Sequence, residues 1–514
     1  MNLDKIEQPF IRNFPGDFSG NPMQRQTPKM LFATVNPVGF PEAELLIFNE
    51  KLSEEIGLGK IENPDDTAFL FGNYIPPQIK TYATAYAGHQ FGNWAGQLGD
   101  GRAIFFGEIE NNSGQKTEIQ WKGAGATPYS RHADGRAVLR SSVREYLMSE
   151  AMHHLKIPTT RALSLALTKE DVVRDIMYDG NPAAEQGAVI MRTAETFLRF
   201  GHFELLSAQK EIETLQKLTD FIIENYFPEI QSVGNQKYKD FFEEISRRTA
   251  HLMVEWFRVG FVHGVMNTDN MSVLGLTVDY GPFSMIDEYD LNFTPNTTDL
   301  PGKRYAFGKQ GQISQWNLWQ LANALFPLIQ DEKFLELILN DYSFYFWEKH
   351  DEMLAKKFGF GKVLKSDEKF FTDWQQMMHD LHLDHTLFFS ELEKRNQNPD
   401  VSEFLQKASY QIPSSENEFR LSEFFSIYQN RLSENTILKE ESLSLMKENN
   451  PKFILRNYLL FECIEELETG KTDLLNKILQ ALEKPYQEIF PEFSQKCPEK
   501  YSGIVGCSML SCSS

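Results

Sequence analysis

Apolar residues recur at helical spacing over most of the second half of the chain. The segments Leu205–Tyr226 and Phe241–Val259 are predicted to be helices. Residues 312–500 carry several more amphipathic stretches and almost no alternation typical of strands. The second half is therefore expected to be a largely helical body.

One long helix is also predicted in the first half, over residues 137–155. Its apolar stripe repeats every four residues, at Leu139, Val143, Leu147, Ala151 and Leu155. Pro158 lies just beyond the expected end of this helix. A shorter helix is predicted over residues 41–57 from a similar spacing.

The remainder of the first half is predicted to form short strands. The runs 103–109 and 118–121 flank the turn signal Asn111-Asn112-Ser113-Gly114 and predict a hairpin. Further strands are expected over 162–167 and 188–192, with a short β pair over 271–279. Residues 1–40 lack periodicity and are expected to form an arm or an irregular packing segment. The fold class is predicted to be α+β, with a β-rich lobe ahead of a helical lobe.

Composition narrows the function classes. Asp and Glu total 72 against 51 Lys and Arg, a formal net charge of −21 with no basic block, which argues against nucleic acid as a partner. No apolar run approaches the length of a membrane span, and no signal segment is visible, so a cytoplasmic protein without a membrane partner is expected. The 4 cysteines are too few for a disulfide framework in 514 residues.

Two clusters in the β-rich part could bind a nucleotide. Gly99, Gly101 and Arg102 precede a strand, where backbone amides and an arginine can cradle a phosphate, although a plain hairpin turn would look the same. Lys122 ends the next strand, and Glu145 follows on the predicted helix. An ion pair between them would hold the lysine toward phosphates; the alternative is a solvated glutamate. This order is that of a protein-kinase small lobe.

A third cluster, residues 261–281, would supply a metal site. Asn270 and Asp279 offer two oxygen ligands suited to Mg²⁺ with a bound triphosphate, whereas an Asx-rich turn is the alternative. They stand where a kinase has its metal-binding Asn and the Asp of Asp-Phe-Gly. The kinase base position is Val265, which cannot accept a proton. Asp269 is the nearby carboxylate that could replace it.

The chain resembles the selenoprotein O family over essentially its whole length. The matching stretches are Tyr86–Gly92, Leu98–Ala103, Gln120–Gly125, Tyr129–Arg131, Asp134–Ala137, Arg192–Ala194, Phe197–Gly201, His263–Asn270 and Asp279–Pro282. The resemblance implies a kinase-like fold with ATP held in reversed orientation, and transfer of AMP rather than phosphate to protein hydroxyls. Some bacterial members transfer UMP with Mn²⁺, so UTP and Mn²⁺ are alternatives to ATP and Mg²⁺.

The resemblance also assigns roles to individual residues. It implies that Asn270 and Asp279 bind the metal and that Asp269 is the base. The nucleotide-binding residues that it implies are Gly99, Gly101, Arg102, Lys122, Asp134, Gly135, Arg192 and Arg199, with Asp279 shared. Arg192 and Arg199 would hold the terminal phosphates, from one helical face if their segment is a helix. The implied organisation is an N-terminal arm (1–75), an N-lobe (76–204), a helical C-lobe with the metal site (205–420) and a helical extension (421–514).

The carboxyl terminus departs from some relatives. In the family a Cys or selenocysteine lies near the end, here Cys512, and in some bacterial members it pairs with a Cys in the segment after the Asp-Tyr-Gly motif. Residues 290–303 contain no Cys, so that pairing cannot form. A Cys507–Cys512 link, a link to another protein and a flexible tail with free thiols are the remaining alternatives.

Three functions are compatible with these motifs. A protein nucleotidyltransferase is favoured, a phosphoryl-transferring kinase is disfavoured by Val265, and a nucleotide-binding scaffold without transfer activity is the third. The protein substrates are not indicated by any motif.

Overall fold

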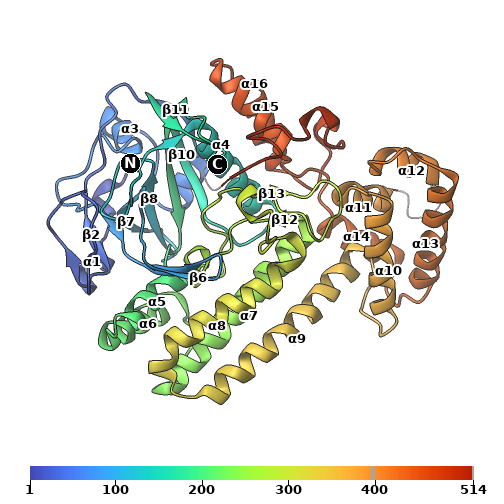
Figure 1. Ribbon diagram of the computed structural model, residues 1–514, viewed down its shortest axis with the longest axis horizontal. Helices are drawn as coiled ribbons and strands as arrows, with labels where there is room; N and C mark the ends of the chain where they lie inside the picture. The colour runs from blue at the N-terminus through green and yellow to red at the C-terminus, as the bar shows by residue number, and fades with distance from the viewer. Residues whose placement is uncertain (395–399, 512–514) are drawn as a thin grey trace.

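The computed structural model describes residues 1–394 and 400–511 and has a mixed α and β fold (Figure 1). In those ranges nine strands form one mixed sheet in the order β1-β2-β4-β7-β8-β11-β10-β3, with β9 pairing β11. The strands are β1 (Gly16–Asp17), β2 (Phe32–Thr34), β3 (Glu44–Phe48), β4 (Tyr82–Thr84), β7 (Ala103–Glu110), β8 (Lys116–Lys122), β9 (Ala137–Val138), β10 (Arg161–Arg174) and β11 (Ala183–Ala194). A separate hairpin, β5 (Ala87–Gln90) and β6 (Asn93–Gln97), lies at one end of this sheet.

The hairpin of β7 and β8 confirms the sequence prediction. Asn111 closes its turn, because the Asn111 side-chain oxygen accepts hydrogen bonds from the backbone N–H groups of Ser113 and Gln115, both at 3.0 Å. Gly114 has a φ of 82°, a conformation that glycine adopts without strain. The turn therefore sets the register that brings Lys122 opposite Ala103.

The predicted helix over 137–155 is α4 (Leu139–His154). Every residue from Leu139 to Met152 is buried, polar ones included. One side packs on β10 and β11, and the other meets α15 (Asn457–Glu468) and α16 (Asp473–Leu482). The helix is thus enclosed between the sheet and the end of the chain.

The helical part begins at α5 and fills the rest of the chain (Figure 1). Its helices are α5 (Phe200–Ala208), α6 (Ile212–Tyr226), α7 (Asn235–Val259), α8 (Gln310–Ile329), α9 (Glu332–Lys357), α10 (Asp367–Asp380), α11 (His385–Lys394), α12 (Val401–Ala408), α13 (Ser415–Ser433) and α14 (Lys439–Asn449). Two short helices, α2 (Glu50–Glu55) and α3 (Pro64–Leu70), and α1 (Pro9–Asn13) belong to the first 75 residues. No described helix is both long and apolar enough to cross a membrane.

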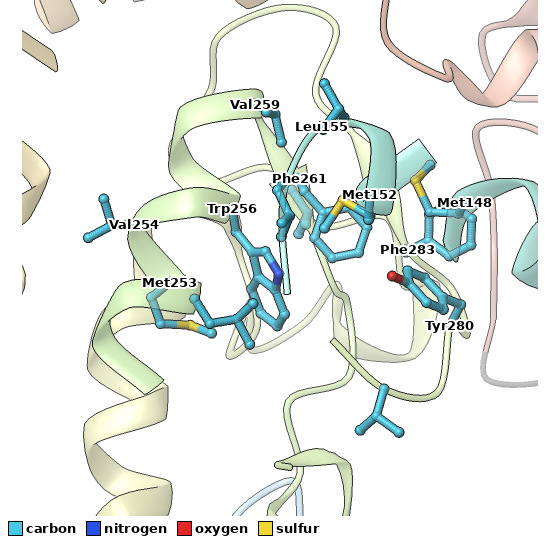
Figure 2. Packing of buried hydrophobic residues seen from close by; sticks show 14 of the residues in the cluster. Met148, Met152, Leu155, Met253, Val254, Trp256, Val259, Phe261, Tyr280 and Phe283 are labelled. Atoms are coloured by element: carbon cyan, nitrogen blue, oxygen red, sulfur yellow. The ribbon is translucent and has the colours of Figure 1, made fainter. Parts of the chain in front are cut away.

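Apolar packing fixes the sheet to the helical part. Figure 2 shows Met148 and Met152 of α4 beside Trp256 of α7, Phe283 and Tyr280. All five side chains are at most 2% exposed. Burial on this scale contributes about 1.5–3 kcal/mol for each large side chain. Because Tyr280 follows Asp279 directly, this core holds the Asp-Tyr-Gly motif in place.

Four sequence expectations were wrong or incomplete. Residues 41–57 are not one helix: β3 pairs with β10, and Asn49 then caps α2 by accepting from the Leu52 N–H. The helix expected over 205–226 starts at Phe200 and breaks at Lys210, whose φ is 59°.

The short β pair expected over 271–279 is also absent from the described chain. Ser272 and Thr277 make only isolated bridges, and the pair is instead β12 (Phe261–Val262) with β13 (Ser284–Met285). Residues 1–40 are more ordered than predicted, because β1 and β2 join the main sheet. The domain boundaries given above stay predictions.

Candidate active site

The glycine cluster lies on the turn between β6 and β7. Gly99 has a φ of 148°, and a Cβ there would lie 2.5 Å from the Tyr129 ring and 2.7 Å from the Thr84 carbonyl oxygen. A Cβ on Gly101 would lie 2.8 Å from the Tyr129 carbonyl oxygen. Close backbone packing thus accounts for both glycines, whereas contact with a phosphate stays a prediction. Arg102 follows them, and its carbonyl accepts from the Gly123 N–H at 2.7 Å.

Lys122 and Glu145 form an ion pair. The Lys122 Nζ lies 2.6 Å from Glu145 Oε2 and 3.7 Å from Asp279 Oδ1. The Lys122 side chain is only 8% exposed, so it lies within the core although it ends a strand. Burial lowers the pKa of Lys122 to about 8, although the Glu145 carboxylate opposes that shift. A lysine at this end of β8 is therefore buried, charged at neutral pH and held by its partner.

Arg192 and Arg199 converge on Asp279 from two elements. Arg192 lies in β11 and Arg199 caps α5, so they do not share a helical face as the sequence analysis allowed. Arg192 Nη1 is 2.6 Å from both Glu145 Oε1 and Asp279 Oδ1. Arg199 Nη1 is 2.5 Å from Asp279 Oδ2 and 2.8 Å from the Asp269 carbonyl oxygen. Sheet and helix together bring the two guanidinium groups to one carboxylate.

Asp279 is the centre of this cluster. Its φ is 59°, a strained left-handed value for aspartate. Burial alone would raise the pKa of the Asp279 carboxyl, but Arg199, Arg192 and Lys122 hold the pKa well below its usual range. Three cations thus face the two carboxylates of Glu145 and Asp279.

Several buried hydrogen-bond donors beside Asp279 are unused. Arg192 Nε, Arg199 Nη2 and Gln120 Nε2 have no hydrogen-bond partner among the described residues. Unsatisfied buried donors are costly, and an anion would satisfy them. This arrangement is typical of a phosphate-binding site.

Asp269 lies next to the cluster, in a short 3-10 helix, Thr268–Asn270. Its Oδ2 accepts a hydrogen bond from Gln90 Nε2 at 3.0 Å, and its Oδ1 is buried without a partner in the described chain. Burial raises the pKa of Asp269 to about 6, against the lowering effect of the Gln90 bond. A carboxyl with this pKa is ionised at pH 7 and can accept a proton.

Asn270 and Asp279 are the candidate metal ligands. The Asn270 side chain donates to the Val265 carbonyl at 2.9 Å, which leaves its Oδ1 as an acceptor. No group of three or more His, Cys, Asp or Glu side chains suited to a metal occurs in the described ranges. Two protein oxygens fit Mg²⁺ or Mn²⁺ that is completed by phosphate oxygens and water, rather than a closed protein cage.

The sequence analysis gave no role to Gln90 or to its neighbours on the hairpin. The His89 N–H donates to Thr268 Oγ1 at 2.7 Å, and the Phe91 N–H donates to Asn267 Oδ1 at 3.1 Å. Gly88 packs so closely that a Cβ there would lie 2.9 Å from Asp269 Oδ1. The motif Tyr86–Gly92 was visible in the sequence, but only the folded chain reveals that it holds the Asp269 loop.

Asp134 and Gly135 lie on the loop before β9. Asp134 pairs with Arg174 at 2.7 Å, and its side chain is 46% exposed. Gly135 has a φ of 70°, and a Cβ there would lie 2.1 Å from the Gly125 carbonyl oxygen. The glycine is required by this close approach, and the nucleotide role of both residues stays a prediction.

Cys507 is buried as a free thiol. It is 1% exposed, and burial raises its pKa to about 12, so it is a weak nucleophile at neutral pH. Cys512 lies outside the described residues, and so does the predicted link to it. The tail before it pairs with the segment after Asp-Tyr-Gly, because the Thr297 N–H donates to the Leu510 carbonyl at 2.7 Å.

Comparison with known protein sequences also indicates a transferase. The model of the family "Protein adenylyltransferase SelO" matches residues 18–483, so the chain belongs to this family of transferases. Proteins named "Protein nucleotidyltransferase YdiU" are similar over the full length. The relative from Cytophaga hutchinsonii is 46% identical, over 100% of this chain and 99% of its own. The relative from Flavobacterium johnsoniae is 43% identical over 99% of this chain and 99% of its own. The relative from Azoarcus sp. is also 43% identical, over 98% of this chain and 98% of its own.

Proposed function

We propose that this protein transfers AMP from ATP to a hydroxyl group of another protein and releases pyrophosphate. One observation carries the proposal: Lys122, Arg192 and Arg199 converge on Asp279, next to a buried Asp269 with a free oxygen. UTP is the alternative co-substrate, with UMP transferred in the same way. The sheet with α4 and the following helices would form the two lobes of a kinase-like fold.

The cations suit the charge that develops during such a transfer. The acceptor oxygen bonds to the α-phosphorus while the bond from that phosphorus to the bridging oxygen of the β-phosphate breaks. The electron pair leaves with pyrophosphate, so negative charge builds on the β- and γ-phosphates. Preorganised cations in a site shielded from water stabilise that charge strongly. The unused N–H groups of Arg192, Arg199 and Gln120 are the donors available to receive it.

Asp269 is the proposed proton acceptor. Its Oδ1 would take the proton that the acceptor hydroxyl loses as the new P–O bond forms, and would later release it to water. Gln90 holds the other carboxylate oxygen at 3.0 Å and so orients the group. Val265, at the position of the kinase base, has no group for this task.

Asn270 and Asp279 would hold Mg²⁺ or Mn²⁺ together with phosphate oxygens. A bound divalent ion would supply positive charge to those oxygens. Asp279 is now engaged by Arg192 and Arg199. When nucleotide binds, phosphate would take over part of their hydrogen bonding and release carboxylate oxygens. Gly99, Gly101, Arg102, Asp134 and Gly135 are proposed to contact the nucleotide from the loops around β8.

Labelled nucleotides test the proposal directly. ATP labelled on the α-phosphate should label an acceptor protein, and ATP labelled on the γ-phosphate should not. Label from the γ-phosphate would identify a kinase, and binding of ATP without any transfer would identify a scaffold. A parallel reaction with α-labelled UTP decides between AMP and UMP.

A further inference from the structure

A partly exposed aromatic surface lies beside the Asp269 loop. It consists of His89 and Trp94 on the β5–β6 hairpin, Trp316 and Trp319 on α8, and Arg304; we call it the acceptor surface. Ring centroids of Trp94 and His89 are 5.1 Å apart, and those of His89 and Trp316 are 5.5 Å apart. Trp94 is 47% exposed and Trp319 is 57% exposed. Trp94, His89 and Trp316 therefore form one continuous row of rings that is exposed at Trp94, and Trp319 follows three residues after Trp316 on α8.

The hairpin joins this surface to the proposed base. His89 belongs to the surface and donates through its backbone to Thr268, while the next residue, Gln90, donates to Asp269. In Figure 1, β6 lies at the end of the sheet that faces α8. A chain segment bound to this surface would thus contact the same hairpin that holds Asp269.

Arg304 gives the surface a charge preference. Its guanidinium carbon lies 4.6 Å from the centre of the Trp316 ring, and it also packs against Gly92, where a Cβ would lie 3.4 Å from that carbon. In residues 1–394 and 400–511 no salt bridge involves the Arg304 guanidinium, and its buried Nε has no hydrogen-bond partner. The Asp299 carboxylate accepts a hydrogen bond from the Arg304 backbone N–H, at 2.9 Å, rather than from its guanidinium group. In a chain with a net charge of −21, a cation without a carboxylate is available for one from a partner.

The unpaired edge of strand β6 is suited to binding an extended peptide segment. Asn93, Trp94 and Ala95 are exposed, and β6 pairs only with β5 in the described chain. Exposed backbone at a strand edge can bind an extended peptide through main-chain hydrogen bonds. Tryptophan and arginine are also the residues that most often dominate the energy of protein interfaces.

We propose that the acceptor surface binds an extended segment of the protein that is modified. The segment would carry an acidic residue close to its hydroxyl residue, paired with Arg304, and an apolar side chain against Trp94 and Trp319. This inference rests on the proposed function, whose site it extends from the nucleotide to the acceptor.

A peptide series tests the acceptor surface. Each peptide carries one Ser in an alanine-rich background, with Asp, Lys, Phe or Ala at each flanking position, and incorporation of α-labelled AMP is measured. The wild-type protein should prefer peptides with Asp and Phe near the Ser. Arg304→Gln should raise KM for the Asp peptides about fivefold. Arg304→Glu should reverse the preference toward Lys. Trp94→Ala and Trp319→Ala should each raise KM at least about fivefold, with KM for ATP unchanged.

Two variants outside the surface serve as controls. Phe344→Ala removes an aromatic side chain that is 83% exposed on α9, and Lys333→Gln removes an exposed charge on the same helix; both should behave as wild type. The thermal midpoint of each variant reports its folding, and Trp94→Leu repeats the test if Trp94→Ala is unstable.

Three results with labelled peptides would overturn the inference. They are a wild-type protein indifferent to flanking Asp, an Arg304→Glu variant with unaltered preference, and tryptophan variants with normal KM for peptides. Absence of peptide labelling while ATP is still cleaved to AMP and pyrophosphate would also overturn it and leave the nucleotide chemistry standing. Failure to cleave ATP at the α-phosphate at all would remove the proposed function and this inference together.

Discussion

Arg199 joins the two acidic residues of the candidate site: its Nη1 is 2.5 Å from Asp279 Oδ2 and 2.8 Å from the carbonyl oxygen of Asp269. The proposed metal ligand Asp279 and the loop of the proposed base are therefore linked by a single guanidinium group. Arg199 is 1% exposed, so the link is shielded from water. Substitutions at either acidic residue are therefore expected to disturb the other.

Lys122→Met should abolish transfer while the protein still folds. The substitution removes the positive charge near Asp279 and roughly preserves the buried volume. Loss of one preorganised charge typically lowers the rate about 10²–10³-fold. Initial rates of AMP transfer and the thermal midpoint measure the two effects.

The structure favours Met over Ala at this position, because Lys122 is buried and truncation to Ala would add a cavity. Glu145 would keep Arg192 as a partner in the variant. Full activity in Lys122→Met would show that the lysine has no part in the chemistry.

Asp279→Asn should reduce transfer more than Asp269→Asn. Asp279 is proposed to hold the metal and also neutralises three cations, so its loss is expected to cost about 10²–10³-fold in rate. Asp269 is proposed to accept a proton that leaves late in a loose transition state, so a residual rate is expected. Single-turnover transfer at saturating ATP and Mg²⁺ compares the two. The opposite ranking would exchange the two assigned roles.

The pH profile of kcat/KM should be bell-shaped. Asp269 must be ionised to accept a proton, and its pKa is raised to about 6, so activity should be lost as pH falls through 6. Lys122 must be charged, and its pKa is lowered to about 8, so activity should also fall as pH rises above 8.

Gln90→Leu isolates the acid limb of that profile. The hydrogen bond from Gln90 stabilises the ionised form of Asp269, so its removal should raise the Asp269 pKa. The acid limb should then shift to higher pH while the alkaline limb stays in place. An unmoved acid limb would mean that another group controls it.

Transfer should require a divalent cation that prefers oxygen ligands. EDTA should abolish activity, and Mg²⁺ or Mn²⁺ should restore it, because Asn270 and Asp279 offer only oxygen. Zn²⁺ should not substitute for them. Restoration by Zn²⁺ alone would contradict the site, and calorimetry of ATP binding with and without Mg²⁺ gives a readout besides turnover.

The local pattern of apolar and turn residues correctly predicted the secondary-structure elements that pair with a neighbour in the sequence. The β7–β8 hairpin was predictable because its turn residues lie between its own strands. Residues 44–48 were misassigned because an apolar run of that length suits a strand or a helix, and only pairing of Phe48 with Ser164 decides between them. The convergence of Arg192 and Arg199 on Asp279 could not be predicted from local periodicity either, because these contacts join residues that are 87 and 80 positions apart in the sequence.

The enclosure of α4 has a consequence for control of the enzyme. Protein kinases are commonly switched by an outward movement of the helix whose glutamate pairs with the buried lysine, because that movement separates the two side chains. Here α15 and α16 pack against α4, and 14 of the α4 residues are buried. The Lys122–Glu145 pair is thus formed while α4 is held between the sheet and those two helices. Regulation by an outward movement of α4 would require α15 and α16 to undock first.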